Sequence, residues 1–295
     1  MKWFGVVNPR AGKKGSPYEE VISVADHLGF ECTFKESESG DHIRSLVLEA
    51  VEEGATGIVS VGGDGTANLV LNALMNANSN NRNTLAIVSS GSGSDFVRTF
   101  GHKSTIRDGL SRLARTDIDR YPIDVGLARG EFGERYFVNA LTTGVTAASV
   151  AKANTLPRWV GSARYTAAFW IALWSFPNAR ASVRVDRHQF DGEAITVVVA
   201  NGQFFGGGLN IAPRSVLGDG QLDVQVFRGP RRQAFSVMPR VKLGTHLSHR
   251  GVQRFSGSDI HVDVPVSWPV EVDGEMLGWG SVEVEVLPEA VDFVI

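Results

Sequence analysis

Residues 61–68 read Val61-Gly62-Gly63-Asp64-Gly65-Thr66-Ala67-Asn68. They follow the apolar run Ala55 to Val61, which predicts a buried strand, and they precede Leu69 to Leu74, which predicts a helix. A glycine-rich turn between a strand and a helix start is a place where backbone N–H groups and the positive helix end hold phosphate. Glycine favours this contact because it has no Cβ to keep the phosphate away. Asp64 would repel a phosphate unless Mg²⁺ lies between them, so the stretch predicts a nucleotide polyphosphate bound with its metal.

Composition narrows the class of protein further. The 295 residues are enough for two domains, and a formal net charge of -3 argues against a strongly basic nucleic-acid binder. The single cysteine, Cys32, excludes an internal disulfide and is consistent with a reducing compartment. The first apolar run is too short for a signal peptide, and no segment reaches the roughly 20 apolar residues of a membrane span. We therefore expect a cytoplasmic protein with no nucleic-acid partner.

The first 120 residues alternate between predicted strands and helices. The strands are expected at 3–7, 31–35, 58–61 and 85–88, and the helices at 16–28, 41–53, 67–75 and from 96 onward. Such alternation predicts a mostly parallel sheet covered on both faces, with ligands outside the carboxyl ends of the strands. Turn-rich segments fall at three of those ends, at 8–15, 62–68 and 90–95.

From about Tyr121 the pattern changes to short alternating runs separated by turn signals, which predicts an antiparallel sandwich or barrel. One apolar segment, Trp159 to Phe176, interrupts the strands as a helix. It is either a buried helix packed on a sheet, or a wall of a lipid cleft or a surface that touches a bilayer.

Several motifs, taken together, resemble the diacylglycerol kinase catalytic-domain family, which includes sphingosine and ceramide kinases and, more distantly, NAD kinases and 6-phosphofructokinases. The nucleotide loop Gly62 to Thr66 carries the first resemblance. The other motifs follow in the family's order: Asn8 to Gly12, Ser90 to Phe96, Ile123 to Gly126, Phe205 to Asp223 and Val272 to Glu275. The strongest likeness is to the family's soluble bacterial lipid kinases. The chain departs from the usual second loop by having Ser92 in place of Thr and Ser94 in place of Asn.

The resemblance implies an α/β plus β fold with two domains. A Rossmann-like α/β nucleotide-binding domain would span 1–122, and the C-terminal residues 285–295 are a candidate to complete it. A β-sandwich domain for a lipid substrate would span 123–284, with the active site in the cleft between the two domains.

The resemblance also implies roles for individual residues in an ATP- and Mg²⁺-dependent phosphoryl transfer. Residues expected to bind the nucleotide are Asn8, Gly62, Gly63, Asp64, Gly65, Thr66, Asn68 and Ser92. Asp64 would organise the catalytic Mg²⁺, Asp124 would position the metal or the base, and Glu275 would be the general base. A second, structural Mg²⁺ would be held by the Asp219 carboxylate and the backbone carbonyls of Val216 and Gln221. The alternative for Asp124, Asp219 and Glu275 is an ordinary role in turns.

One further segment, 228–254, lies outside the motifs. It has seven Lys or Arg residues and no acidic residue, which leaves a formal charge of -10 on the remainder of the chain (-3 less +7). Such a segment predicts either a solvated face or transient contact with an anionic membrane surface. In the second case the enzyme would be peripheral to the membrane.

The sequence leaves two rival functions open. An NAD kinase would share the glycine loop, but the Asn-Glu motif expected to anchor its acceptor nucleotide is absent from the expected region, and Phe205 to Leu222 favours the lipid branch. A non-catalytic nucleotide or lipid sensor is disfavoured because Asp64, Asp124 and Glu275 are all present. The lipid acceptor is not identified by the sequence, and a homodimer remains an open alternative.

Overall fold

The computed structural model describes residues 1–12, 15–77, 82–90, 95–101, 105–156 and 163–295. Residues within it form two compact units, one of Met1–Ile123 with Glu289–Ile295 and the other of Asp124–Pro288. We call these unit 1 and unit 2 and describe each by itself. Ser92 and Ser94, predicted in the second nucleotide loop, lie outside the described residues.

Unit 1 is built on a parallel sheet with the strand order β2-β1-β3-β4, to which the end of β17 adds in parallel. The strands are β1 (Trp3–Val7), β2 (Thr33–Glu36), β3 (Gly57–Gly62), β4 (Thr84–Ser89) and β17 (Val282–Val294). The helices are α1 (Tyr18–Leu28), α2 (Gly40–Glu52), α3 (Asp64–Met75), α4 (Asp95–Thr99) and α5 (Ile106–Leu113). Three of these strands, β1, β3 and β4, are buried along their whole length, as expected for a parallel sheet with both faces covered.

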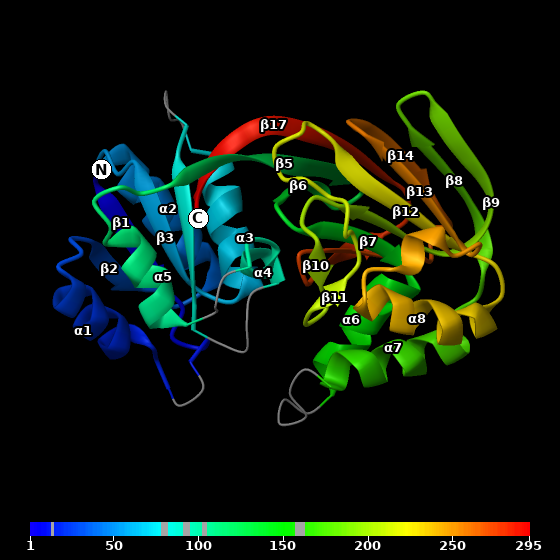
Figure 1. Cartoon of the computed structure of the whole chain (residues 1–295), viewed down its shortest axis with the longest axis horizontal. Coiled ribbons are helices and arrows are strands. Elements are labelled where there is room, and N and C mark those ends of the chain that lie inside the picture. Colours follow the sequence, from blue (N-terminus) through cyan, green and yellow to red (C-terminus); the bar gives the residue numbers. More distant parts are fainter. Residues whose placement is uncertain (13–14, 78–81, 91–94, 102–104, 157–162) are drawn as a thin grey trace. The chain divides into compact units, whose positions relative to one another are not determined.

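Local sequence explains where the helices of unit 1 begin and end. The Ser39 hydroxyl accepts the His42 N–H at the start of α2, and the Thr105 hydroxyl does the same for Asp108 at α5. Gly29 ends α1 with a left-handed φ of 66°. Helices α1 and α5 pack against each other, as do α2 and α3, so each pair covers the sheet (Figure 1).

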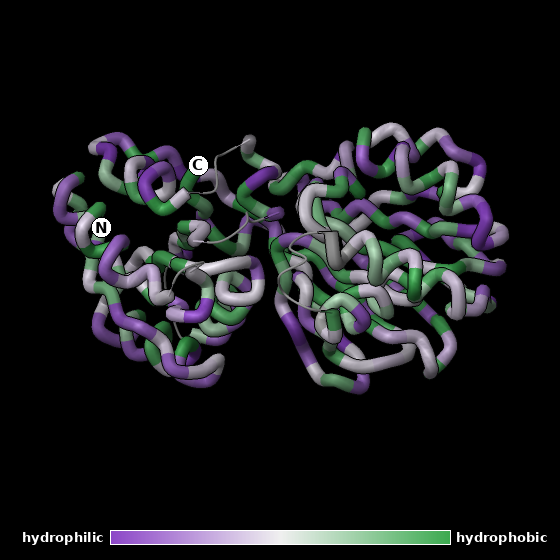
Figure 2. The backbone as a smooth tube through the Cα atoms, turned by 90° about the horizontal axis from the view of Figure 1, so that it is seen from below, coloured by the Kyte–Doolittle hydropathy of each residue, from purple (hydrophilic) through white to green (hydrophobic). Residues whose placement is uncertain are grey.

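Unit 2 is an antiparallel β structure with a central strand order β16-β15-β7-β9-β8-β14-β17. Its strands are β5 (Arg120–Gly130, which begins in unit 1), β6 (Gly133–Phe137), β7 (Ala140–Gly144), β8 (Ala179–Val185), β9 (His188–Ala200), β10 (Phe204–Phe205), β11 (Leu209–Asn210), β12 (Leu222–Arg228), β13 (Val252–Gly257), β14 (Asp259–Asp263), β15 (Pro269–Val272) and β16 (Glu275–Trp279). Strand β9 also pairs with β12, which pairs with β13. Inward-facing valines from these strands form one core around Trp268 and Phe137. Figure 2 shows hydrophobic (green) and hydrophilic (purple) stretches alternating along the backbone.

Three helices cover one side of this β structure: α6 (Val145–Thr155), α7 (Ala163–Ser175) and α8 (Ala234–Lys242), with a short 3-10 turn, η2 (Arg231–Gln233), before α8 (Figure 1). A second 3-10 turn, η3 (His246–Ser248), follows α8. The sequence indicated only α7 as a helix, within Trp159 to Phe176. Helix α6 has almost no amphipathic pattern because it consists mainly of alanine, valine, serine and threonine, and α8 has Pro239 in its interior, so neither gives a clear helical signal.

Candidate active site

The glycine loop of unit 1 connects β3 directly to α3. Gly63 is the N-cap residue of α3 and has no side chain to cap the helix. The N–H groups in the first turn of α3 are therefore not capped by a side chain at position 63, and they lie at the positive end of the helix dipole. Asp64 is the first helical residue, so α3 begins three residues earlier than the predicted Ala67 because the glycine turn is already helical.

The two glycines at this turn serve different needs. A Cβ on Gly62 would lie 2.5 Å from Thr66 Oγ1, so the fold itself requires glycine there. A Cβ on Gly63 would meet no atom of the described residues within 4 Å, and the φ of this residue is an ordinary -103°. The space beside Gly63 is thus open, and it lies at the helix end where an anion would bind.

Neighbouring segments of unit 1 fix this loop by hydrogen bonds. The Asn8 side-chain amide donates to Thr66 Oγ1 (2.8 Å), and the Asn8 N–H donates to the Val61 carbonyl (3.0 Å). Asp64 Oδ2 accepts the Asp95 N–H at the start of α4 (3.2 Å). Asn68 is buried one turn further along α3 and accepts from the Asn72 amide. The structure therefore brings Asn8, Thr66 and Asp64 together around the start of α3.

In unit 2, the predicted site residues gather at one end of the β structure. Strand register places Asp223, Ala200 and Ala140 side by side on β12, β9 and β7, and Val272 pairs with Leu141 on the next strand. Because the loops that follow or precede these residues leave the same end of the sheet, Asp219 and Glu275 belong to connections at that one end.

Asp124 is completely buried and holds one of these connections. Its Oδ2 accepts the Gly220 N–H (2.7 Å), and its own N–H donates to the Leu217 carbonyl (2.6 Å). The Asn201 amide donates both to the Asp124 carbonyl (2.7 Å) and to the Val138 carbonyl (3.0 Å). Asp124 therefore anchors the 217–220 loop, in which Asp219 is exposed and its Oδ1 accepts the Gln221 N–H (3.0 Å).

The turn before Glu275 is held by a second buried carboxylate. Asp273 and Gly274 both have left-handed φ values, 47° and 91°, as a two-residue type I′ hairpin turn between β15 and β16 requires. The Asp273 carboxylate accepts the N–H groups of Val138 (3.2 Å), Asn139 (3.1 Å) and Ala140 (2.9 Å). This residue thus joins the turn to the connection between β6 and β7.

A third carboxylate, Glu271, was not predicted as a site residue. It is 3% exposed, accepts the Gly274 N–H through Oε1, and accepts the Thr142 hydroxyl through Oε2 (2.7 Å). Burial raises the pKa of Glu271 to about 7. The two hydrogen bonds partly oppose this shift, whereas the charge of the nearby Asp273 adds to it. The only sequence signal was a glutamate in the middle of an otherwise apolar strand, Pro269–Val272.

Glu275 itself is partly exposed, with 37% of its side chain accessible, and its Oε2 forms an ion pair with the Arg135 guanidinium. Arg135 comes from β6, 140 residues earlier in the chain. The pair fixes the direction of the Glu275 carboxylate, and Arg135 is a further residue that sequence reasoning missed.

An apolar cavity of about 90 Å³ lies in unit 2 among α6, α7, α8 and the strands that they cover. Its walls include Val145, Val150, Phe169, Ile195, Phe227 and Val237. The lining is mostly aliphatic and aromatic, which suits a hydrocarbon chain better than a nucleotide.

Metal ligands are less concentrated than these polar groups. Across the described ranges, no group of three or more His, Cys, Asp or Glu side chains is arranged to hold a metal ion. Mg²⁺ in phosphotransferases usually needs only one or two carboxylates because phosphate and water oxygens complete its shell. Asp64 and Asp219, each accessible to solvent and supplied by a loop or a helix start, therefore fit the oxygen chemistry of Mg²⁺.

Comparison with known proteins places these features in a family. Residues 2–127 match the diacylglycerol kinase catalytic domain, and residues 139–295 match the YegS C-terminal NAD kinase beta sandwich-like domain. A probable lipid kinase YegS-like protein of Shewanella frigidimarina is 28% identical over 262 residues, covering 88% of this chain and 82% of that protein. The lipid kinase YegS of Escherichia coli K12 is 25% identical over 279 residues, covering 93% of this chain and 90% of that protein.

Solved structures agree on the architecture. A crystal structure of a putative diacylglycerol kinase from Bacillus anthracis superposes with a TM-score of 0.81 at 21% identity, covering 99% of this chain and 96% of that one, which shows the shared fold. The predicted fold class, an α/β domain followed by a β-sandwich-like domain, is thereby confirmed. The chain belongs to the YegS-type lipid kinase family, within the diacylglycerol kinase catalytic-domain group, and is a phosphotransferase with an alcohol group as acceptor.

Proposed function

We propose that this protein transfers the γ-phosphate of ATP, with Mg²⁺, to a hydroxyl of a lipid such as diacylglycerol. The observation that carries the proposal is the apolar cavity under α6, α7 and α8. The glycine loop is common to lipid kinases and to NAD kinases, whereas an apolar cavity of this kind accepts an acyl chain and offers little to a second nucleotide. Several relatives are themselves named lipid kinases, which supports the same acceptor class.

The donor half of the reaction is assigned to unit 1. Backbone N–H groups at the start of α3 and the open space beside Gly63 would receive the nucleotide phosphates. The Asn8–Thr66 hydrogen bond keeps the loop after β1 against this helix start, so the cradle is formed before the nucleotide binds. Phosphoryl transfer asks the protein mainly for such positioning.

We assign the catalytic Mg²⁺ to Asp64. A second, structural Mg²⁺ is assigned to the Asp219 carboxylate and the backbone carbonyls of Val216 and Gln221. When bound, Mg²⁺ would neutralise negative charge on the phosphates while the phosphoryl group is transferred. Asp124 would act on the second site indirectly, because it holds the loop that carries Asp219. Its role in this proposal is therefore positioning.

Glu275 is the proposed general base. Arg135 holds Oε2, so we assign Oε1 as the oxygen that accepts the proton of the lipid hydroxyl. The Asp273-Gly274 turn and its hydrogen bonds to 138–140 and Glu271 fix the position of this carboxylate. The proton leaves the hydroxyl as its oxygen bonds to the γ-phosphorus, and the bond to ADP breaks.

The test is transfer of labelled γ-phosphate to a panel of lipid alcohols and, in parallel, to NAD. We expect a lipid product with the native protein and a rate lower by roughly 10²- to 10⁴-fold with Glu275→Gln, while ATP binding persists. Glu193→Gln is the matched control, because Glu193 is an exposed strand glutamate of the same unit, away from this turn. Label on NAD alone would support an NAD kinase instead, and ATP binding with no transfer to any acceptor would support a sensor.

A further inference from the structure

Between Ala167 and Trp174 the outer face of α7 is apolar, which is unusual for a solvent-facing helix. Ala167, Ile171 and Trp174 are spaced to form one stripe, and all three are exposed. Trp174 is 86% exposed and Ile171 47%. The opposite side of the helix, with Ala168, Ala172 and Leu173, is already buried in the unit, so the outer stripe does not serve that core.

Helix α8 continues this apolar surface. Phe235 is 69% exposed and its ring stacks on Trp170 of α7, with ring centroids 4.7 Å apart. Arg231, just before α8, donates from Nη1 to the Trp174 carbonyl (2.8 Å) at the end of α7. Together with Leu243 at the end of α8, these helices supply four of the eight large hydrophobic side chains that are exposed in the described part of the chain.

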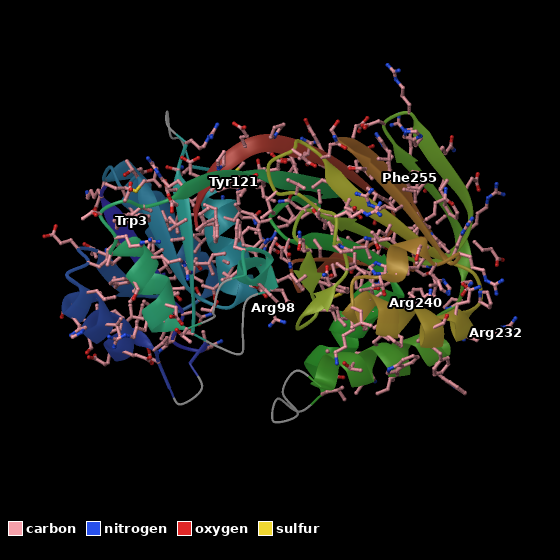
Figure 3. All side chains as sticks on the ribbon, viewed as in Figure 1. Trp3, Arg98, Tyr121, Arg232, Arg240 and Phe255 are labelled. Carbon is pink, nitrogen blue, oxygen red and sulfur yellow. The ribbon has the colours of Figure 1, made fainter. Side chains whose placement is uncertain are left out.

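The segments that carry these side chains contain basic residues and no acidic residue. The chain has no Asp or Glu between Glu134 and Asp186, or between Asp223 and Asp259. Arg232, Arg240 and Lys242 are exposed on η2 and α8, and Figure 3 labels the first two on the helical side of unit 2.

One basic residue of the segment 228–254 does not contribute to the outward-facing charge. Arg254 forms an ion pair with the buried carboxylate of Asp223, so its charge serves the interior of the unit. Burial raises the pKa of Asp223, and Arg254 opposes that shift. The charge that faces outward therefore comes mainly from η2, α8 and the turn that follows α8.

We propose that α7 and α8 form a docking face for an anionic lipid bilayer, with Ile171, Trp174 and Phe235 entering the interface and the basic side chains contacting lipid phosphates. Tryptophan and phenylalanine beside Lys and Arg are the composition of helices that lie in the plane of a membrane interface. The long basic side chains can keep their charges at headgroup level while their stems cover apolar surface. No described helix is both long enough and apolar enough to cross a bilayer.

A charged protein partner would be recognised differently. The two helical segments combine exposed aromatic rings with cations and themselves carry no acidic side chain for ion pairs to a basic partner. Two acidic residues of β9, Asp191 and Glu193, lie beside Gln233 and Arg250. An anionic headgroup layer over an apolar interior complements both features at once. The same helices enclose the apolar cavity, so a lipid leaflet at this face would also adjoin the proposed acyl-chain site.

The experiment measures binding of the full chain to vesicles of phosphatidylcholine alone and of phosphatidylcholine mixed with phosphatidylglycerol, without ATP. We expect binding only to the mixed vesicles, weakened by added salt. The double variant Arg232→Gln/Arg240→Gln should bind roughly 30-fold more weakly, because each cation near such a surface contributes about a fivefold factor. Trp174→Ala should weaken binding roughly tenfold through lost apolar contact.

Matched controls separate this face from general surface effects. Trp279→Ala removes another exposed tryptophan of unit 2, 58% accessible, and Arg184→Gln/Arg187→Gln removes two exposed cations from β8 and its turn. Both controls should bind vesicles like the native protein. Equal binding by all variants, or equal losses in the controls, would overturn the proposal.

Two further readouts keep the result interpretable. Brominated acyl chains should quench tryptophan fluorescence in the native protein, and most of that quenching should disappear in Trp174→Ala. A change in oligomeric state caused by Trp174→Ala, with vesicle binding unaltered, would assign the face to a second copy of the chain and refute membrane docking. Because ATP is omitted, failure here leaves the proposed kinase reaction untouched.

Discussion

Replacement of Glu271 by glutamine should change how stability depends on pH. Burial raises the pKa of the Glu271 carboxyl from its ordinary value of 4.5 to about 7 in the folded protein. Between these two values the folded chain keeps a proton that the unfolded chain releases, so stability falls as pH rises through this range. A difference of about 2.5 pKa units corresponds to a loss of about 3 kcal/mol that is complete above pH 7 or so.

The Glu271→Gln variant cannot ionise but keeps the hydrogen-bonding shape of the protonated acid. Its carbonyl oxygen can accept the Gly274 N–H, and its amide can donate to the Thr142 hydroxyl, which is free to rotate. We therefore expect the variant to gain about 3 kcal/mol relative to the native protein between about pH 5 and about pH 8.

Urea unfolding followed by tryptophan fluorescence measures this difference, because five of the six tryptophans lie within the residue range of unit 2. The comparison is made between the two proteins at each pH, so other titrating groups cancel. Parallel stability curves across the pH range would show that Glu271 is ionised in the fold and refute the reasoning.

Substitutions at four further positions have distinct expected outcomes. Gly63→Ala should leave thermal stability unchanged but weaken ATP binding at least tenfold in an equilibrium binding assay, because the added methyl group occupies the open space beside the helix start. Gly62→Ala should lower thermal stability as well, because there the added methyl group meets Thr66. Asp273→Ala should cost at least about 3 kcal/mol in unfolding experiments by orphaning three backbone N–H groups, whereas Asp273→Asn, which tolerates the left-handed φ, should cost less. Asp124→Ala should cost about 2 kcal/mol and speed hydrogen exchange at the Gly220 amide, and unchanged exchange there would contradict the anchoring role.

The α/β part of the fold could be predicted because its signals are local. The strand Thr84–Ser89 has an uninterrupted apolar run from Leu85 to Val88, and the glycine-rich loop 62–68 marks the change from strand to helix within a few residues. The family followed from the order of several such motifs. Helix ends were off by a few residues where the turn itself is helical, as at Asp64.

The contacts that hold Glu275 in place could not be predicted from the sequence, because they join residues that lie far apart along the chain. Arg135 meets Glu275 only because β6 and β15–β16 come together at one end of unit 2, and Asp273 meets 138–140 across more than 130 residues of sequence. No composition or spacing encodes such a partnership; it depends on strand register. Glu271 is similar, since a lone glutamate in an apolar strand gives no indication of whether it faces solvent or Thr142.

These buried polar groups bear on how catalytic roles are assigned. Asp124 and Asp273 each satisfy backbone N–H groups that would otherwise be unpaired, so removing either one disturbs a loop as well as any chemistry. Loss of activity in Asp124→Ala therefore does not by itself make Asp124 catalytic. Asn201→Ala disturbs the same connection, because the Asn201 amide binds the Asp124 carbonyl, yet it leaves the carboxylate in place. If Asp124 only positions the loop, the two variants should lose activity in proportion to their lost stability, and an excess loss confined to Asp124→Ala would assign its carboxylate to the reaction.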